Sequence, residues 1–393
     1  MTPALEKTHP LDSFETKCRE RLPASKCSPS GLSRCAWLIG ALGIVLGATS
    51  TSGCARVASE TAAPAALASE AKAAPARADH LSRAQGLSRH AFEEIHFGNI
   101  PVELTLFAQD ETQARTAARA AFARVAELSA MMNDYAYDPP SQLNRIATAA
   151  PHPAPVAPEL FQALARAIDH HRFTGGAFDV TAKPYVQLWR VSWRLGELPP
   201  PERLRRAARL VDIESLELDP GASTARLVRE GMWLDLGGLA KGLIGDEVVR
   251  LLRAHGVPSC RYHAGGDMVF GDSPPGRVGW SVSVPDFPLG DGEGAPETLM
   301  LLESNSAVSV SGDQFRYVEI EGVRYAHVID PRTGLGVSER RIACVRGLRG
   351  IDTDPLATAG LILDEEAWME ALARVPGCRG WVARPAERGA APR

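Results

Sequence analysis

Residues 324–336, RYAHVIDPRTGLG, place His327 three positions before Asp330. A histidine can accept or release a proton near neutral pH, and a nearby carboxylate can orient it or tune its pKa. The segment also has the pattern of a strand that ends in an Asp-Pro turn. Taken alone, it is equally consistent with a proton-transfer site and with an ordinary strand and turn.

A second group of residues could bind a metal ion. Asp354 and Thr358 are four residues apart in DTDPLATAG, residues 352–360, so on a helix their side chains share one face. A carboxylate and a hydroxyl are hard oxygen ligands that suit Mg²⁺, with phosphate oxygens and water completing its shell. Asp354 also suits an N-cap and Pro355 the first helical position. The local pattern alone therefore favours an ordinary helix start.

Three glycine-rich segments could let a ligand approach the backbone closely. DLGGLAKGLIGD (235–246) predicts a strand end, a glycine turn and a helix start, whose free N–H groups attract anions. Lys241 adds a positive charge there, although the spacing is neither that of a P-loop nor that of a dinucleotide fingerprint. TGGAFDVTAKP (174–184) and HAGGDMVFG (263–271) are the other two. Each segment alone is equally consistent with a tight turn, a helix end or a bulge.

The elements that must position these groups mix helices and strands without a regular βα repeat. Residues 90–108 predict a strand or hairpin, and residues 110–132 a helix capped near Asp110. Closely spaced strand candidates between residues 259 and 330 favour an antiparallel sheet. Residues 354–375 predict one long final helix. We therefore expect an α+β fold with largely antiparallel sheets packed by helices.

Composition divides the chain into three regions, 1–54, 55–89 and 90–393. The first contains an uncharged apolar run at 35–48, which is short for a membrane span and typical of a signal-peptide core. The small residues before Cys54 resemble a bacterial lipoprotein cleavage box, so export and lipid attachment at Cys54 are expected. An uncleaved anchor helix, or a cleaved signal with Cys54 incidental, are the alternatives. The second region is predicted to be a disordered Ala/Pro-rich tether, and the third the folded body.

Charge and cysteine usage exclude other classes. The net charge is −4 and no basic cluster occurs, so no nucleic-acid partner is expected. Neither CxxC nor zinc-ligand spacing is present, which argues against cysteine chemistry and structural zinc.

The order of the motifs resembles that of the ApbE family, the FAD:protein FMN transferases. TGGAFDVT, DLGGLAKG, AGGD, SVSVSGD, HVIDPRTG and DPLATA follow one another in register over about residues 92–363. The resemblance implies an ApbE-like fold with a cofactor cleft between two lobes. It also implies an enzyme that uses Mg²⁺ to split FAD at its diphosphate. FMN would be joined to a Thr or Ser hydroxyl of a target protein, and AMP released.

The resemblance also assigns roles to individual residues. His327 matches the family's catalytic histidine, with Asp330 as its candidate partner. Phe97 stands where the family has Met, and either Tyr135 or Tyr137 is the expected flavin partner. The implied FAD contacts are Phe97, Tyr135, Ala177, Phe178, Asp179, Gly237, Leu243 and Ile329. The implied metal ligands are the carbonyl of Ala240, Asp354, Thr358 and a further carbonyl from Ala357.

The resemblance implies a membrane-linked redox protein as acceptor, carrying a segment like Asp-Gly-x-Ser/Thr-Gly-Ala-Thr. The expected location is periplasmic, with a lipid anchor in the membrane. The same site with water as nucleophile would be an FAD pyrophosphatase that yields FMN and AMP. A flavin-binding lipoprotein without turnover, or an idle assembly factor, is a further alternative. The presence of His327, Asp354 and Thr358 together argues against the non-catalytic lipoprotein.

Overall fold

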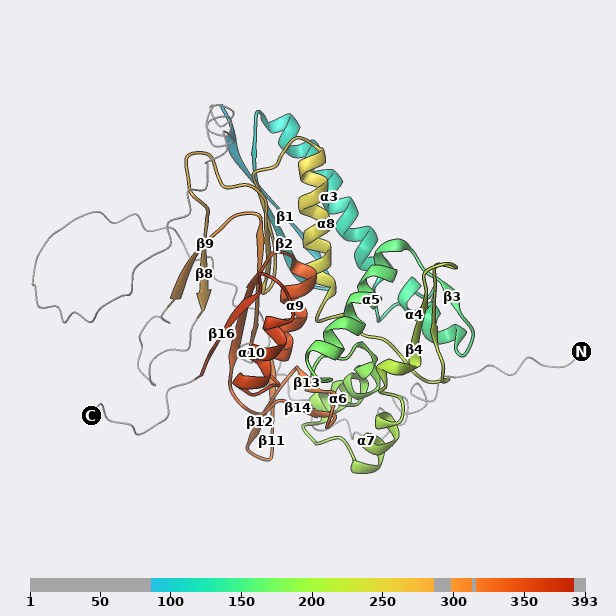
Figure 1. Cartoon of the computed structure of the whole chain (residues 1–393). Coiled ribbons are helices and arrows are strands. Elements are labelled where there is room, and N and C mark those ends of the chain that lie inside the picture. Colours follow the sequence, from blue (N-terminus) through green and yellow to red (C-terminus); the bar gives the residue numbers. More distant parts are fainter. Residues whose placement is uncertain (1–85, 286–297, 313–315, 385–393) are drawn as a thin grey trace, which may run out of the picture. The chain divides into compact units, whose positions relative to one another are not determined.

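The structure is a computed structural model that describes residues 86–285, 298–312 and 316–384 (Figure 1). The predicted leader, the lipidation site and the tether up to residue 85 lie outside the described residues, and the first strand begins at Ser88, two residues before the predicted start of the folded body at 90. Within the described part, every helix is too short or too polar to cross a membrane.

A seven-stranded sheet forms the centre of the folded body, and each of its neighbouring pairs is antiparallel. This confirms the antiparallel prediction. In spatial order the strands are β1 (Ser88–His96), β2 (Ile100–Ala108), β6 (Cys260–Ala264), β7 (Asp267–Phe270), β10 (Ser306–Gly312), β15 (Ile342–Gly347) and β16 (Arg379–Ala383).

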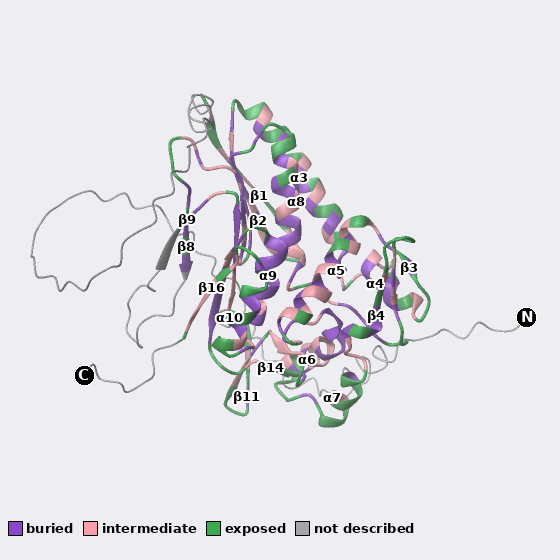
Figure 2. Cartoon of the chain, in the orientation of Figure 1, coloured by how far each residue is buried: buried purple, intermediate pink, exposed green. Residues whose placement is uncertain are grey.

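Helices cover one face of this sheet (Figure 1). The Asp110 side chain caps the first of them by accepting the Gln113 N–H at 2.8 Å, as the sequence predicts. The apolar faces of these helices are buried (Figure 2), and this burial is the main stabilising contribution. The helices are α3 (Glu111–Met131), α8 (Ala240–Ala254), α9 (Gly350–Ala359) and α10 (Glu365–Ala373).

A hairpin covers part of the opposite face. It consists of β8 (Trp280–Pro285) and β9 (Thr298–Glu303). The Trp280 ring packs against Phe107 of β2, with ring centroids 5.7 Å apart. Strand β10 is buried on both of its faces at Ala307 and Val308, although valine and serine alternate in its sequence from Val308 to Ser311.

The chain has a second group of helices, of which the first two pack into the same core as the sheet helices and the last two form a smaller cluster of their own. The 174–184 segment joins two helices of this second group and passes through a short 3₁₀ helix (Val180–Ala182). Two small hairpins carry the 324–336 segment. The helices are α4 (Gln142–Ala149), α5 (Pro158–Phe173), α6 (Lys183–Leu195) and α7 (Pro201–Ala208); a second 3₁₀ helix spans Ile213–Ser215. The strands are β3 (Ala154–Pro155), β5 (Thr224–Leu227), β4 (Leu216–Asp219), β11 (Tyr317–Ile320), β12 (Val323–Ala326), β13 (Ile329–Asp330) and β14 (Leu335–Gly336).

The C-terminal helical region differs from the prediction in two ways. Residues 354–375 are not one long helix, because α9 ends at Ala359 and Asp364 caps α10 by accepting the Ala367 N–H at 2.9 Å. Helix α9 also begins earlier than predicted, so Pro355 lies inside it rather than at its first position. Its start is set by a contact from α8, which the local sequence does not contain.

Candidate active site

The glycine turn before α8 and the helix α9 meet at the centre of the site. A Cβ atom added at Gly242 would lie 2.0 Å from the carbonyl oxygen of Gly350. The two backbones can therefore approach this closely only because both residues are glycine. The Gly242 N–H points at the carboxylate of Asp354, with the nitrogen 3.3 Å from Oδ2. The close approach thus brings a helix N-terminus against a carboxylate.

Asp354 and Thr358 face the same side of α9, as their spacing predicts. Asp354 lies against Gly242, and the Thr358 hydroxyl oxygen is 3.1 Å from the place that a Cβ atom would occupy at Gly238. Ala240, whose carbonyl is the expected third ligand, is the first residue of α8 and lies between these two glycines. Ala357 is fully buried in the α9–α10 core.

This donor set fits Mg²⁺ better than a transition metal. The described residues contain no cluster of three or more His, Cys, Asp or Glu side chains that could hold a metal ion. A cation here would rely on the Asp354 carboxylate, the Thr358 hydroxyl and a backbone carbonyl, which are hard oxygen donors. Burial, reinforced by repulsion from Asp267, raises the pKa of Asp354. A bound divalent cation would counteract this by favouring the ionised form.

Lys241 is held between two carboxylates. Its Nζ lies 3.0 Å from Asp267 Oδ2 and 3.4 Å from Asp354 Oδ2, and it donates to the carbonyl of Gly237 at 3.1 Å. Burial opposes its charge, but the two carboxylates outweigh this and raise the pKa of Lys241. The sequence prediction gave Asp267 no role. Its place in the AGGD motif, directly after two glycines, was the only signal that could have identified it.

The 174–184 segment borders the same turn. Phe178 lies against Gly238, since its Cε2 is 3.2 Å from the place of a Cβ atom there. Asp179 accepts from the N–H and hydroxyl of Thr181 at 2.7 and 2.6 Å. This carboxylate therefore shapes its own turn. Ala177 and Leu243 are buried beside these elements.

Both candidate flavin-stacking tyrosines present a ring to solvent. The Tyr135 side chain is 64% exposed, and Arg190 lies over its ring at 4.0 Å from the centroid. Tyr137 is 45% exposed and packs edge-on against Trp233 at 5.4 Å. Phe97 lies in the β1–β2 turn with a φ of 50° and packs partly against the main core.

His327 occupies an exposed position between β12 and β13, and its backbone N–H donates to the carbonyl of Arg316 at 3.1 Å. Desolvation by the surrounding protein lowers the pKa of His327 to about 4; the positive charges of Arg316 and Lys241 add to this, and the backbone contact with Arg316 opposes it. The histidine is therefore neutral at pH 7 and able to accept a proton. The contribution of Lys241 shows that the ring lies within electrostatic reach of the α8 turn.

Asp330 is bound to its own turn rather than to His327. Its carboxylate accepts three bonds from Arg332, one from the backbone N–H and two from the guanidinium, each 2.9 Å long. The neighbouring Ile329 packs with Tyr185 of α6. The prediction that Asp330 assists proton transfer stays a prediction, while its part in shaping the turn is directly visible.

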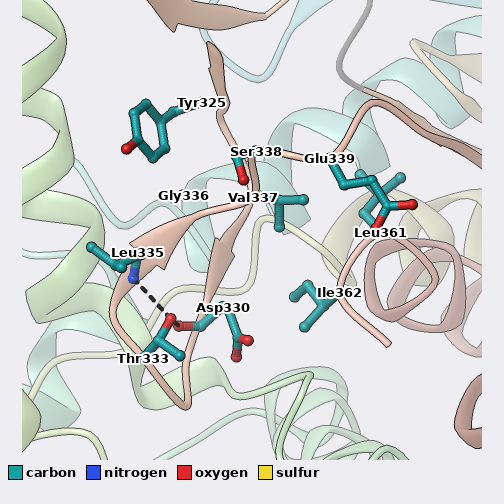
Figure 3. Close-up of a pocket in the computed structure, with 10 residues that line it drawn as sticks. All are labelled: Tyr325, Asp330, Thr333, Leu335, Gly336, Val337, Ser338, Glu339, Leu361 and Ile362. Atoms are coloured by element: carbon teal, nitrogen blue, oxygen red, sulfur yellow. Dashed lines mark hydrogen bonds between the residues drawn. The ribbon is translucent and has the colours of Figure 1, made fainter. Parts of the chain in front are cut away.

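A pocket of about 320 Å³ lies beside the β13–β14 hairpin (Figure 3). Asp330 and Thr333 line it from the hairpin, and Leu361 and Ile362 from the segment after α9. Neither Asp354 nor Thr358 lines this pocket. It is therefore separate from the position of the expected metal ligands.

The fold and site together define an α+β protein with a glycine-rich helix start facing an Asp–Thr pair. The chain matches the model of the ApbE family over residues 99–380, and it belongs to that family. The FAD:protein FMN transferase of Treponema pallidum is 33% identical over 245 residues, covering 59% of this chain and 67% of the relative. That of Haemophilus influenzae is 30% identical over 253 residues, covering 62% and 71%.

Solved structures confirm the fold. The flavin transferase ApbE of Vibrio cholerae superposes with a TM-score of 0.66 at 23% identity, covering 76% of this chain and 97% of its own. An ApbE protein of Thermotoga maritima gives a TM-score of 0.65 at 22% identity, with the same coverages. The predicted ApbE-like α+β fold is confirmed.

Proposed function

We infer that this chain is an FAD:protein FMN transferase. The observation that carries this inference is the family match over residues 99–380, which spans the candidate site from β2 to α9. Relatives of the same family carry that name. The site chemistry is compatible with it, because an anion-attracting helix start, a metal-binding pair and a neutral histidine are the groups that phosphoryl transfer requires.

In the proposed reaction, a hydroxyl oxygen of the acceptor attacks the phosphorus of the FMN half of FAD. The bond between that phosphorus and the bridging oxygen breaks, and AMP leaves with the bridging oxygen. The hydroxyl proton passes to the ring of His327, which is neutral and open to solvent. The product is FMN joined to the acceptor by a phosphoester.

The remaining residues bind and orient FAD. The N–H groups at the start of α8 attract the diphosphate, while the charge of Lys241 is engaged by Asp267 and Asp354. One of the two exposed tyrosines offers a flat surface to a ring system, and Phe178, which is buried, supports the glycine turn at Gly238. Asp354, Thr358 and the carbonyl of Ala240 would hold Mg²⁺. When bound, that ion neutralises negative charge on the diphosphate and on the departing AMP.

The acceptor in this proposal is a membrane-linked redox protein with an Asp-Gly-x-Ser/Thr-Gly-Ala-Thr-like segment. The enzyme acts in the periplasm, anchored by lipid at Cys54, as its leader composition suggests. Mass spectrometry of the membrane-extracted protein tests the anchor. A diacylglyceryl group on an N-terminal Cys54 is expected, and a protein that begins at another residue without lipid refutes the anchor.

The activity is tested by incubating the protein with FAD, MgCl₂ and an acceptor that carries this segment. Flavin fluorescence that stays on the denatured acceptor is the expected result. Free FMN and AMP without labelled acceptor would instead establish the pyrophosphatase. Absence of AMP release would refute both enzymatic alternatives.

A further inference from the structure

Helix α9 is capped by a side chain of α8. The carboxylate of Asp246 accepts the N–H groups of Gly350 and Ile351, at 2.7 and 3.0 Å. The residue at the local N-cap position, Arg349, makes no side-chain cap hydrogen bond. The first orphan donors of α9 are therefore satisfied from a position 104 residues away in sequence.

This cap is one of three contacts that follow one another along the two helices. On α8 and its preceding turn they involve positions 238, 242 and 246, each four residues from the next. On α9 they involve positions 358, 354 and 350, in the opposite direction. The pairs are Gly238 with Thr358, Gly242 with Asp354, and Asp246 with Gly350. Since four residues make about one turn of helix, the cap lies about one turn from Asp354.

Contacts at this spacing fix how far α9 can slide or rotate on α8. The backbone contact between Gly242 and Gly350 sets how closely the two helices approach, but glycine has no side chain that could prevent sliding. The two hydrogen bonds of Asp246 are directional, so they supply that restraint. Asp354 and Thr358 move with α9, whereas the carbonyl of Ala240 moves with α8.

We propose that Asp246 is a positioning residue for metal binding, which holds Asp354 and Thr358 of α9 opposite the carbonyl of Ala240. This inference rests on the proposed function, because it assumes that these three groups bind Mg²⁺. Asp246 itself contacts neither the metal nor FAD. A residue that only stabilised α9 would affect unfolding but not the Mg²⁺ requirement, so the two roles can be separated.

The test compares Asp246→Ala with Asp364→Ala in the full chain. Asp364 is a matched control, because it caps α10 through the Ala367 N–H at 2.9 Å and takes no part in the α8–α9 contacts. MgCl₂ is titrated into each protein by calorimetry, and the MgCl₂ concentration giving half-maximal AMP release is measured separately. Urea unfolding of both variants reports the loss of stability.

Asp246→Ala is expected to weaken Mg²⁺ binding about 10- to 100-fold, the range found when residues that orient metal ligands are removed. Its rate at saturating MgCl₂ should recover most of the wild-type value. Asp364→Ala should lose comparable stability with its Mg²⁺ affinity within about twofold of wild type. Asp246→Asn keeps the size and one acceptor oxygen, so it should fall between wild type and Asp246→Ala, and it serves if the alanine variant does not fold.

The proposal would be overturned if the Asp246 variants bound Mg²⁺ as tightly as wild type. It would also be overturned if Asp246→Ala and Asp364→Ala lost Mg²⁺ affinity to the same extent. Failure of the proposed function looks different. In that case the wild-type protein releases no AMP, while calorimetry still shows that the Asp246→Ala variant binds Mg²⁺ more weakly than wild type.

Discussion

The approach of α8 to α9 predicts that Gly242→Ala damages stability and metal binding together. The added Cβ would be placed 2.0 Å from the carbonyl oxygen and 2.4 Å from the carbonyl carbon of Gly350, and 3.1 Å from the Cβ of Asp354. An ordinary carbon–oxygen contact is about 3.3 Å, so the helices must separate by roughly 1 Å. Two of the three obstructing atoms belong to the backbone, and rotation of a side chain cannot relieve the contact.

The expected loss follows from two opposing effects. Overpacking of this kind costs about 3 kcal/mol or somewhat more. Replacing glycine by alanine within a helix returns about 1 kcal/mol. The net loss of unfolding free energy should therefore be about 2 kcal/mol, measured by urea denaturation in the absence of Mg²⁺.

Gly221→Ala provides the control, because Gly221 lies in an exposed turn and its added Cβ would meet only the Asp219 side chain at 3.3 Å. It should stay within about 0.5 kcal/mol of wild type. Gly242→Ala should also require more MgCl₂ for half-maximal AMP release. A stability within about 0.5 kcal/mol of wild type, together with an unchanged MgCl₂ requirement, would refute the close approach of the two helices.

Further predictions concern individual side chains. Asp354→Ala should raise the MgCl₂ requirement steeply because it removes the only carboxylate ligand; an unchanged requirement excludes the site. His327→Ala should abolish transfer yet retain FAD binding, measured by flavin fluorescence quenching; retained transfer removes it as the base. Because the pKa of His327 is lowered to about 4, kcat/KM should fall on the acid side of its pH profile with an apparent pKa near that value. An apparent pKa of 6.5 or above contradicts this. Burial opposes ionisation of Asp352, but hydrogen bonds from His170 and Arg166 lower its pKa to about 2. Its stabilising contribution is present above pH 4 and is lost as pH falls toward 2, so Asp352→Asn should flatten the pH dependence of urea unfolding there; an unaltered slope contradicts it.

Local patterns predicted those features of the fold and the site that depend on residues close together in the sequence. The cap at Asp110, the helix that follows it and the shared face of Asp354 and Thr358 all result from spacings of three or four residues. Such spacings are set by helix geometry and can be read without tertiary structure.

Long-range contacts account for what the sequence did not reveal. The start of α9 was placed wrongly because its cap comes from Asp246, on another helix. The pairing of Lys241 with Asp267 joins a helix to a strand and has no local signature. Asp330 illustrates the converse, because its position beside His327 in sequence suggested a pair, whereas its carboxylate is bound by Arg332.

The central claim is that this chain transfers FMN from FAD to a protein hydroxyl. Intact-mass spectrometry of the acceptor after incubation with FAD and MgCl₂, with AMP quantified in the same sample, tests it most directly. The account predicts that the acceptor gains the mass of FMN in phosphoester linkage, with one AMP per modified acceptor, and that an acceptor whose Ser/Thr is replaced by Ala gains nothing. An unmodified acceptor, or AMP released equally fast with the Ala acceptor, would contradict it.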